Sequence, residues 1–196
     1  PVLIYQYHPT RSGDVAKAFL RDFEGCVQTD AYSGYNFLDY DEKIRHIGCW
    51  AHARRKFMDV IKAQGKNRKI GSADKALSYI RKLYQIEKEA REKGLSPDEI
   101  YQIRQKESKP ILEDFKQWLL GTSLRTPPKE LLGKAVAYTL NQWDRLVRYI
   151  EDGRLHIDNN MAENAVRPFV VGRKNWLFSG TPEGAEASAL LYSLIE

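Results

Sequence analysis

The sequence predicts an α/β domain that is interrupted by a large all-helical insertion, and three observations support this fold class. Apolar runs of strand length alternate with helical patterns over residues 2–48, which is the order of elements in an α/β fold. From residue 50 to about 152 only helical periodicity occurs, over a stretch too long for a loop. Mixed character then returns. The chain therefore divides into a first core part (1–49), a helical segment and insertion (50–152), and a second core part (153–196).

Composition and charge narrow the class of protein. The 196 residues are 42% hydrophobic and 29% charged, with a net charge of +5, a balance typical of globular domains. No apolar run approaches the roughly 18 residues of a membrane span, and no signal peptide is visible. Two cysteines cannot form a disulfide framework, which favours a reducing, cytoplasmic setting without a membrane partner. Because the chain begins with Pro1, we expect it to be part of a longer protein.

The first core part should begin with a strand and a helix. Residues 2–7 are almost entirely apolar or aromatic, as in a strand buried on both faces. A helix follows, with Ser12 or Asp14 as its N-cap and Gly25 as its stop. Three short elements are expected next: a strand at 26–29, a helical turn at 31–37 and a strand at 44–48.

The middle of the chain should form a helical bundle of its own. Ser96, Pro97 and Glu99 have the spacing of a capping box with proline at the first helical position. A boundary or kink is expected near Pro110. Four helices are predicted: 50–63, 73–93, 96–121 and 126–150.

The tail should contain a helix, an extended segment and a last helix. Asn160 and Glu163 have capping-box spacing at the start of a helix within 158–168. Residues 169–181 read as extended chain with a turn, and 182–195 as the final helix.

Two acidic residues are candidates for chemistry. Asp30 directly follows a short strand, where open α/β sheets place their sites, although it could equally cap the next helical turn. Glu163 lies among three amide side chains in Asn159–Asn164, and the alternative is that it serves only as a capping-box acid. Converging carboxylates are what two-metal phosphoryl transfer requires, so the two acids matter most as a pair.

A third cluster contains Cys49 and His52, three residues apart. A structural zinc site needs four ligands, and the available partners, Cys26 and His46, have no paired spacing. We therefore expect no zinc. Either Cys49 is a buried small residue and His52 bonds locally, or His52 lies close to an active site.

Basic segments suggest contact with a phosphate backbone. Residues 54–69 contain seven Lys or Arg and one acid, and Arg173–Trp176 combines cations, an amide and an aromatic ring. Cations of this kind bind phosphates and a Trp can stack on a base. The alternative is a solvated basic face with a core Trp.

Three strings carry a resemblance to a known family. They are QTDAYSGYN at 28–36, GCWAHARRKF at 48–57 and DGRLHIDNNMAENAVRPFVVGRKNWLFSG at 152–180. In content and order, the chain resembles the DDE transposases of the insertion sequence 66 family over essentially its whole length. The resemblance implies a ribonuclease-H-like core, incomplete here, with the helical insertion before the third acid.

The resemblance also implies residue roles. Asp30 matches the family's second catalytic and metal-binding acid and Glu163 the third. Two Mg²⁺ or Mn²⁺ ions are expected. Near the site lie Cys49, His52 and Asn160. The residues expected to contact DNA are Arg54, Arg55, Arg167, Arg173, Lys174, Asn175 and Trp176.

The implied function is metal-dependent DNA strand cleavage and strand transfer for an insertion sequence. The expected partners are double-stranded DNA, as element ends and target, and further copies of the protein, in the bacterial cytoplasm at the nucleoid. The family's first acid lies upstream of the segment equivalent to 2–7, so these residues alone should be inactive. Two alternatives stay open: a related two-metal nuclease, and a non-catalytic DNA-binding or assembly module.

Overall fold

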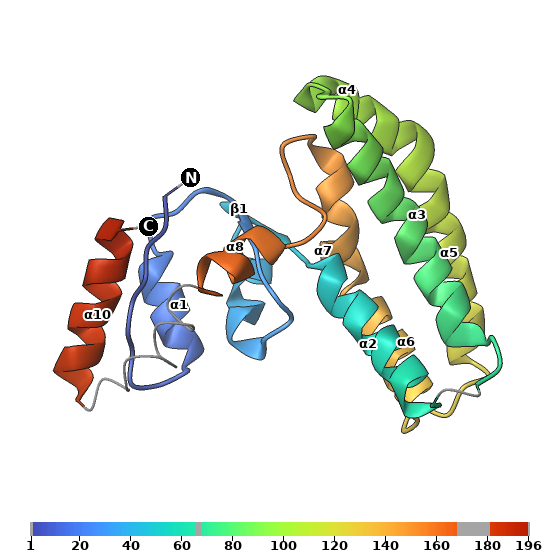
Figure 1. The fold of residues 1–196 in the computed structure, drawn as a ribbon, viewed down its shortest axis with the longest axis horizontal. Coiled ribbons are helices and arrows are strands. Elements are labelled where there is room, and N and C mark those ends of the chain that lie inside the picture. Colours follow the sequence, from blue (N-terminus) through green and yellow to red (C-terminus); the bar gives the residue numbers. More distant parts are fainter. Residues whose placement is uncertain (1, 66–67, 168–180, 196) are drawn as a thin grey trace.

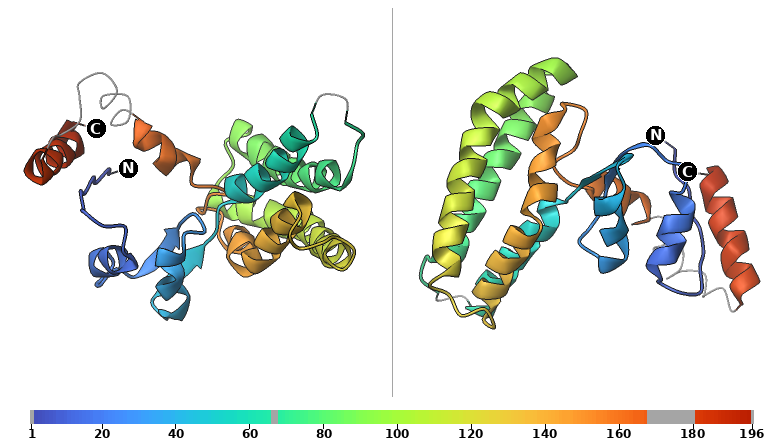
Figure 2. Two further views of the ribbon diagram at one scale, coloured as in Figure 1. Left: turned by 90° about the horizontal axis from the view of Figure 1, so that it is seen from below. Right: turned by 180° about the vertical axis from the view of Figure 1, so that it is seen from behind.

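The computed structural model describes residues 2–65, 68–167 and 181–195, except for the side chain of residue 195. Its helices and strands fall into two regions (Figures 1 and 2). A long helical bundle occupies one side, and a small sheet with short helices occupies the other. Helix α8 lies between the bundle and the terminal segments of the chain (Figure 1).

In the part of the chain that the structure describes, the sheet consists of two parallel strands, β1 (Gly25–Gln28) and β2 (Ile44–Ile47). Gly25 pairs with Ile44 and Gln28 with Ile47. The 3₁₀ helix η1 (Ser33–Tyr40) connects them, so the two predicted strands and the helical turn between them are confirmed. Parallel strands end at the same edge of a sheet, which places the residue after β1 beside the end of β2.

The predicted strand at 2–7 is wrong. In the described part of the chain this segment pairs with neither strand, and Val2 and Ile4 are 87% and 66% exposed. The backbone N–H of Tyr5 instead donates to Ser193 Oγ at 2.8 Å, on helix α10 (Pro182–Ile195). An apolar run forms a strand only where a neighbouring backbone accepts its hydrogen bonds.

Both helices near the chain ends form, but α1 is shorter than predicted. Helix α1 covers Gly13–Phe19, and Ser12 Oγ accepts from the N–H of Asp14 at 3.2 Å, as expected of its N-cap. The helix ends well before Gly25, which has a φ of 136° and begins β1. The final helix predicted at 182–195 is confirmed as α10.

The bundle contains the four predicted helices. Its elements are α2 (Trp50–Ala63), α3 (Ser72–Glu92), α4 (Pro97–Ile103), the π-helix η2 (Arg104–Ser108), α5 (Lys109–Ser123), α6 (Leu131–Asn141), α7 (Trp143–Val147) and the 3₁₀ helix η3 (Arg148–Glu151). The predicted kink near Pro110 takes the form of the π-helix just before it. The last helix starts at Leu131 rather than 126 and is interrupted at Gln142.

The capping box at the start of α4 is confirmed. Glu99 Oε2 accepts from the N–H of Ser96 at 2.8 Å, and Ser96 Oγ accepts from the N–H of Glu99 at 3.4 Å. Proline occupies the first helical position, where its missing N–H costs nothing.

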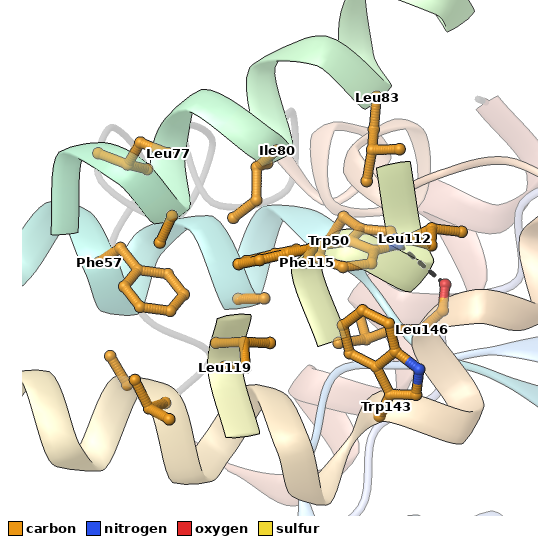
Figure 3. Close-up of a cluster of buried hydrophobic side chains, with 14 of the residues drawn as sticks. Trp50, Phe57, Leu77, Ile80, Leu83, Leu112, Phe115, Leu119, Trp143 and Leu146 are labelled. Carbon is orange, nitrogen blue, oxygen red and sulfur yellow. Dashed lines mark hydrogen bonds between the residues drawn. The ribbon is translucent and has the colours of Figure 1, made fainter. Parts of the chain in front are cut away.

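Aromatic side chains fill the bundle core (Figure 3). Phe115 is fully buried, with the rings of Trp50 and Tyr79 stacked on it at centroid distances of 6.0 and 4.9 Å. The indole N–H of Trp50 donates to the Leu146 carbonyl at 2.8 Å. Buried indole groups need such a partner, so this bond fixes where α2 crosses α7.

The chain enters and leaves the bundle at one place. The N–H of Trp50 donates to the Ile157 carbonyl at 3.1 Å, and the N–H of Gly48 to the Arg145 carbonyl at 2.9 Å. The Gln28 side chain donates to the carbonyls of Gly48 and His156. The end of the sheet is therefore fastened to the segment that leads into α8.

Among the helices that the structure describes, none has both the length and the apolar character needed to cross a lipid bilayer.

Candidate metal and nucleic-acid site

The structure places Asp30 and Glu163 on the wall of one cavity of about 630 Å³. Asp30 comes from the end of β1 and Glu163 from helix α8 (Asn160–Ala165). Asn159, Tyr32 and Tyr35 line the same cavity. Two acidic residues that are far apart in the sequence thus line a common space, next to the carboxyl end of the sheet.

Asp30 is partly used by its own turn. Its Oδ1 accepts from the N–H of Tyr32 at 3.0 Å, just before η1. The capping interpretation of Asp30 therefore holds for one carboxylate oxygen. Within the described residues no partner bonds its Oδ2, so the second oxygen is available to a ligand in the cavity.

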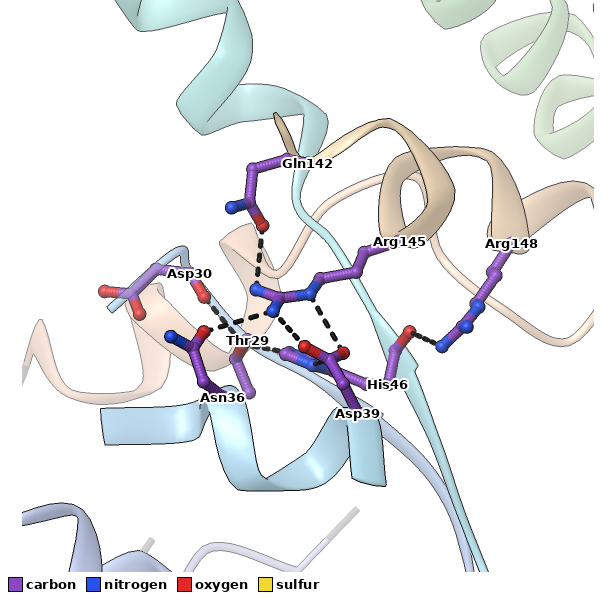
Figure 4. Close-up of polar contacts among 8 residues, drawn as sticks. All are labelled: Thr29, Asp30, Asn36, Asp39, His46, Gln142, Arg145 and Arg148. Carbon is purple, nitrogen blue, oxygen red and sulfur yellow. Dashed lines mark hydrogen bonds and ion pairs between the residues drawn. The ribbon is translucent and has the colours of Figure 1, made fainter. Parts of the chain in front are cut away.

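A buried polar network supports the backbone at Asp30 (Figure 4). Thr29 Oγ1 donates to the Asp30 carbonyl at 2.6 Å and lies 2.8 Å from His46 Nε2. His46 Nδ1 lies 2.9 Å from Asp39 Oδ1, and Arg145 Nε donates to the same oxygen at 3.0 Å. The network joins β1, η1, β2 and α7, so it ties the turn at Asp30 to the bundle.

Burial sets the charge state of this network. Desolvation lowers the pKa of His46, which is fully buried, and the nearby Arg145 and Arg148 add to the effect, against the opposing hydrogen bond with Asp39. Burial raises the pKa of Asp39, but hydrogen bonds from Arg145 and His46 outweigh it, so the net shift is downward. Asp39 is therefore charged at neutral pH and lies between Arg145 and His46.

Sequence reasoning missed most of this network. It treated His46 only as a possible zinc ligand and did not single out Thr29, Asp39 or Arg145. A histidine at an inward position of the strand pattern IRHIG was the one available signal, because a buried imidazole requires hydrogen-bond partners.

The predicted capping box at Asn160 is wrong. The N-cap of α8 is Asn159, whose side chain makes no capping bond. Asp158 replaces the expected box: its Oδ1 accepts from the N–H of Asn160 at 3.1 Å and its Oδ2 from Asn160 Nδ2 at 2.9 Å. An aspartate two residues upstream competes effectively for that N–H, so the Glu163 carboxylate is not used in a cap of α8.

Basic side chains on α2 approach Glu163. His52 Nε2 lies 3.4 Å from Glu163 Oε1, and Arg55 Nη2 lies 3.9 Å from Oε2. His52 Nδ1 is buried and has no partner among the described atoms. The structure thus puts His52 next to Glu163.

The candidate zinc ligands do not gather. Cys49 is buried, and desolvation raises the pKa of its thiol. Cys26 is exposed on β1, and both ring nitrogens of His46 belong to the polar network. Over residues 2–65, 68–167 and 181–195, no group of three His, Cys, Asp or Glu is placed to hold a metal ion. Asp30 and Glu163 line their common cavity as a pair of such residues.

The bundle positions the segment that carries Glu163. Tyr84, on α3, donates its hydroxyl to Asp158 Oδ2 at 2.7 Å. Arg104 is 2% exposed, pairs with Glu87, and donates to the carbonyls of Tyr149, Asp152 and Leu155 at 2.7 to 2.8 Å. These bonds fix the chain just before α8 from the inner side of the bundle.

The basic residues predicted to contact DNA are only partly described. Arg54, Arg55 and Arg167 are exposed. Four lie outside the described residues: Arg173, Lys174, Asn175 and Trp176. In the connector after α2, Arg68 forms a two-bond ion pair with Asp74, at 2.7 Å for each bond, so part of the charge in that segment is neutralised locally.

Comparisons with known proteins show the family. The sequence model described as the IS66 transposase family matches residues 1–187, and the chain belongs to this family. It is 34% identical over 201 residues to the uncharacterized protein y4jD of Sinorhizobium fredii, and 30% identical over 207 residues to y4hP of the same organism. These matches cover 100% of the chain and 38% and 37% of the relatives. The chain thus spans less than two fifths of their length. No solved structure matches it.

Proposed function

We propose that this chain supplies the second and third acids of a DDE-type transposase, within a ribonuclease-H-like catalytic core. The observation that carries the proposal is the shared cavity of Asp30 and Glu163, in a chain of the IS66 transposase family. The proposed substrates are double-stranded DNA at the element ends and at the target. In the same proposal, several copies of the protein assemble on this DNA in the bacterial cytoplasm.

The oxygen atoms that line the cavity are suitable ligands for divalent cations that prefer oxygen ligands. Two carboxylates line it, and Asn159 Oδ1 is a buried amide oxygen without a partner among the described atoms. Mg²⁺ and Mn²⁺ favour carboxylate and amide oxygens. When bound, such ions would polarise a phosphate and activate water. Asp30 and Glu163 would hold them, together with the family's first acid, which the resemblance places outside these residues.

The protein groups around the acids would orient them. Thr29 and His46 fix the backbone of Asp30, and Asp158 fixes the start of the helix that presents Glu163. Arg55, 3.9 Å from Glu163, is placed to attract a phosphate to the edge of the site. A carboxylate held by several such contacts loses less freedom when it binds a ligand.

Cleavage of duplex DNA that carries element ends tests the proposal, in a full-length family member containing this chain. Asp30→Asn and Glu163→Gln should each abolish cleavage with Mg²⁺ or Mn²⁺ and weaken Mn²⁺ binding measured by calorimetry. Asp114→Asn, which changes an exposed acid on α5, should leave both unchanged. Wild-type rates in either site variant would refute the assignment. Nicking without strand transfer would identify a two-metal nuclease, and DNA binding without cleavage a non-catalytic module.

A further inference from the structure

A hollow of about 280 Å³ opens between α2 and α3 on the bundle surface. It is lined by two arginines, two apolar side chains and one tyrosine: Arg54, Arg81, Met58, Leu77 and Tyr84. Arg54 and Met58 lie one turn apart on α2, and Leu77, Arg81 and Tyr84 follow along one face of α3. Both arginines are exposed.

The hollow carries charge that its surroundings do not neutralise. No carboxylate lines it, and among the described residues neither Arg54 nor Arg81 has an acidic partner within 4 Å. Some other cations of the bundle are paired: Arg68 with Asp74, Lys88 with Glu92 and Arg104 with Glu87. Two guanidinium groups over an apolar floor are suited to bidentate contact with phosphate oxygens.

The position of the hollow connects it to the acid pair. His52 and Arg55 approach Glu163 from one face of α2, and Arg54, one or two residues away from them, points to another face of the same helix. Tyr84, on its wall, donates to Asp158 at the start of α8. The hollow therefore lies beside the start of α8, the helix that carries Glu163.

We propose that Arg54 and Arg81 form a phosphate-binding groove for duplex DNA on the helical bundle. Arg54 was expected to contact DNA from the sequence; Arg81 lies in a helix that gave no such signal. The inference deepens the proposed function and rests on it, because the occupant is the DNA that the acid pair would cut. The bundle would then bind DNA in addition to positioning the segment that carries Glu163.

The test is binding of this chain to a duplex of about 30 base pairs, by fluorescence anisotropy in EDTA over a range of salt concentrations. Arg81→Gln should weaken binding several-fold, and the Arg54→Gln, Arg81→Gln double variant by about tenfold or more. Each lost phosphate contact should reduce the salt slope by about 0.9. Arg125→Gln removes an exposed cation beyond the end of α5 and should leave affinity and slope unchanged.

Wild-type affinity and salt slope in the double variant would overturn the groove, as would a wild-type chain that binds no duplex in low salt. Circular dichroism spectra verify that the variants fold. The readout is independent of catalysis. If the double variant binds normally while Asp30→Asn abolishes cleavage, the groove is wrong and the proposed function stands. If Asp30→Asn cleaves normally, the proposed function fails whatever the binding data show.

Discussion

His46 Nδ1 lies 2.9 Å from Asp39 Oδ1 inside the protein, where β2 approaches η1. Because Arg145 also bonds Asp39, this contact is the centre of the network that supports Asp30. It contains a histidine with no access to solvent, so its protonation is coupled to folding.

Stability should fall as pH drops from neutral, in part because of His46. Burial lowers the pKa of His46 in the folded state, so the unfolded chain binds the proton first, below about pH 6.5. This share of stability is present above that pH and is lost as pH falls towards the folded pKa. Urea unfolding at pH 7.5 and 5.5 measures it. His46→Gln should flatten the dependence, while the exposed His156→Gln should retain the wild-type slope.

Arg104→Met should destabilise the bundle by about 3–5 kcal/mol, because it leaves a largely buried Glu87 carboxylate and three carbonyl groups without their donor. The midpoint of urea unfolding reports the loss. The control is Arg154→Gln, which removes an exposed pair with Asp152 and should change stability by less than about 1 kcal/mol. Equal effects of the two substitutions would contradict the role of Arg104.

Tyr84→Phe should weaken Mn²⁺ binding and slow cleavage, since it removes only the hydroxyl that holds Asp158 before α8. We expect a stability loss of about 1–3 kcal/mol, as for a hydrogen bond to a charged group. Tyr101→Phe changes an exposed tyrosine on α4 and provides the matched control. An unfolding curve that shifts while Mn²⁺ affinity stays at the wild-type value would limit Tyr84 to a structural role.

Two glycines in the helical region should respond oppositely to alanine. A Cβ at Gly153 would lie 1.8 Å from the Pro97 carbonyl oxygen, so Gly153→Ala must displace the segment before α8 and should cost about 1–3 kcal/mol. At Gly121, inside α5, the nearest atom would be 3.8 Å away. Gly121→Ala should therefore stabilise the helix by about 0.5–1 kcal/mol. Thermal unfolding of both variants checks the signs.

Local sequence patterns predicted the bundle because helical periodicity and caps are set by residues within one or two turns. Ser96 and Glu99 form their box as expected. The same reasoning failed at Asn160, where Asp158 competes for the N–H. It also failed at 2–7, since strand pairing depends on a partner that the local pattern does not contain.

The sequence predicted the two acids of the candidate site but not the residues that support them. The place of Asp30 after a strand and of Glu163 at a helix start singled them out, the resemblance supplied their expected roles, and their common cavity is a result of the fold. The contact between Asp39 and Arg145 joins residues 106 positions apart. No periodicity or spacing rule connects such residues, so the network behind Asp30 could not be predicted from the sequence.

The backbone bond between Trp50 and Ile157 has a consequence for how relatives can diverge. It closes the excursion through the bundle, so both of its ends are fixed where the sheet meets α8. The entropy of closing a chain segment grows only logarithmically with its length, by about 0.6 kcal/mol per doubling. Members of the family could therefore gain or lose whole helical turns at the C-terminal ends of α2 and α5 and at the N-terminal ends of α3 and α6, while the arrangement of the two acids in space stays the same.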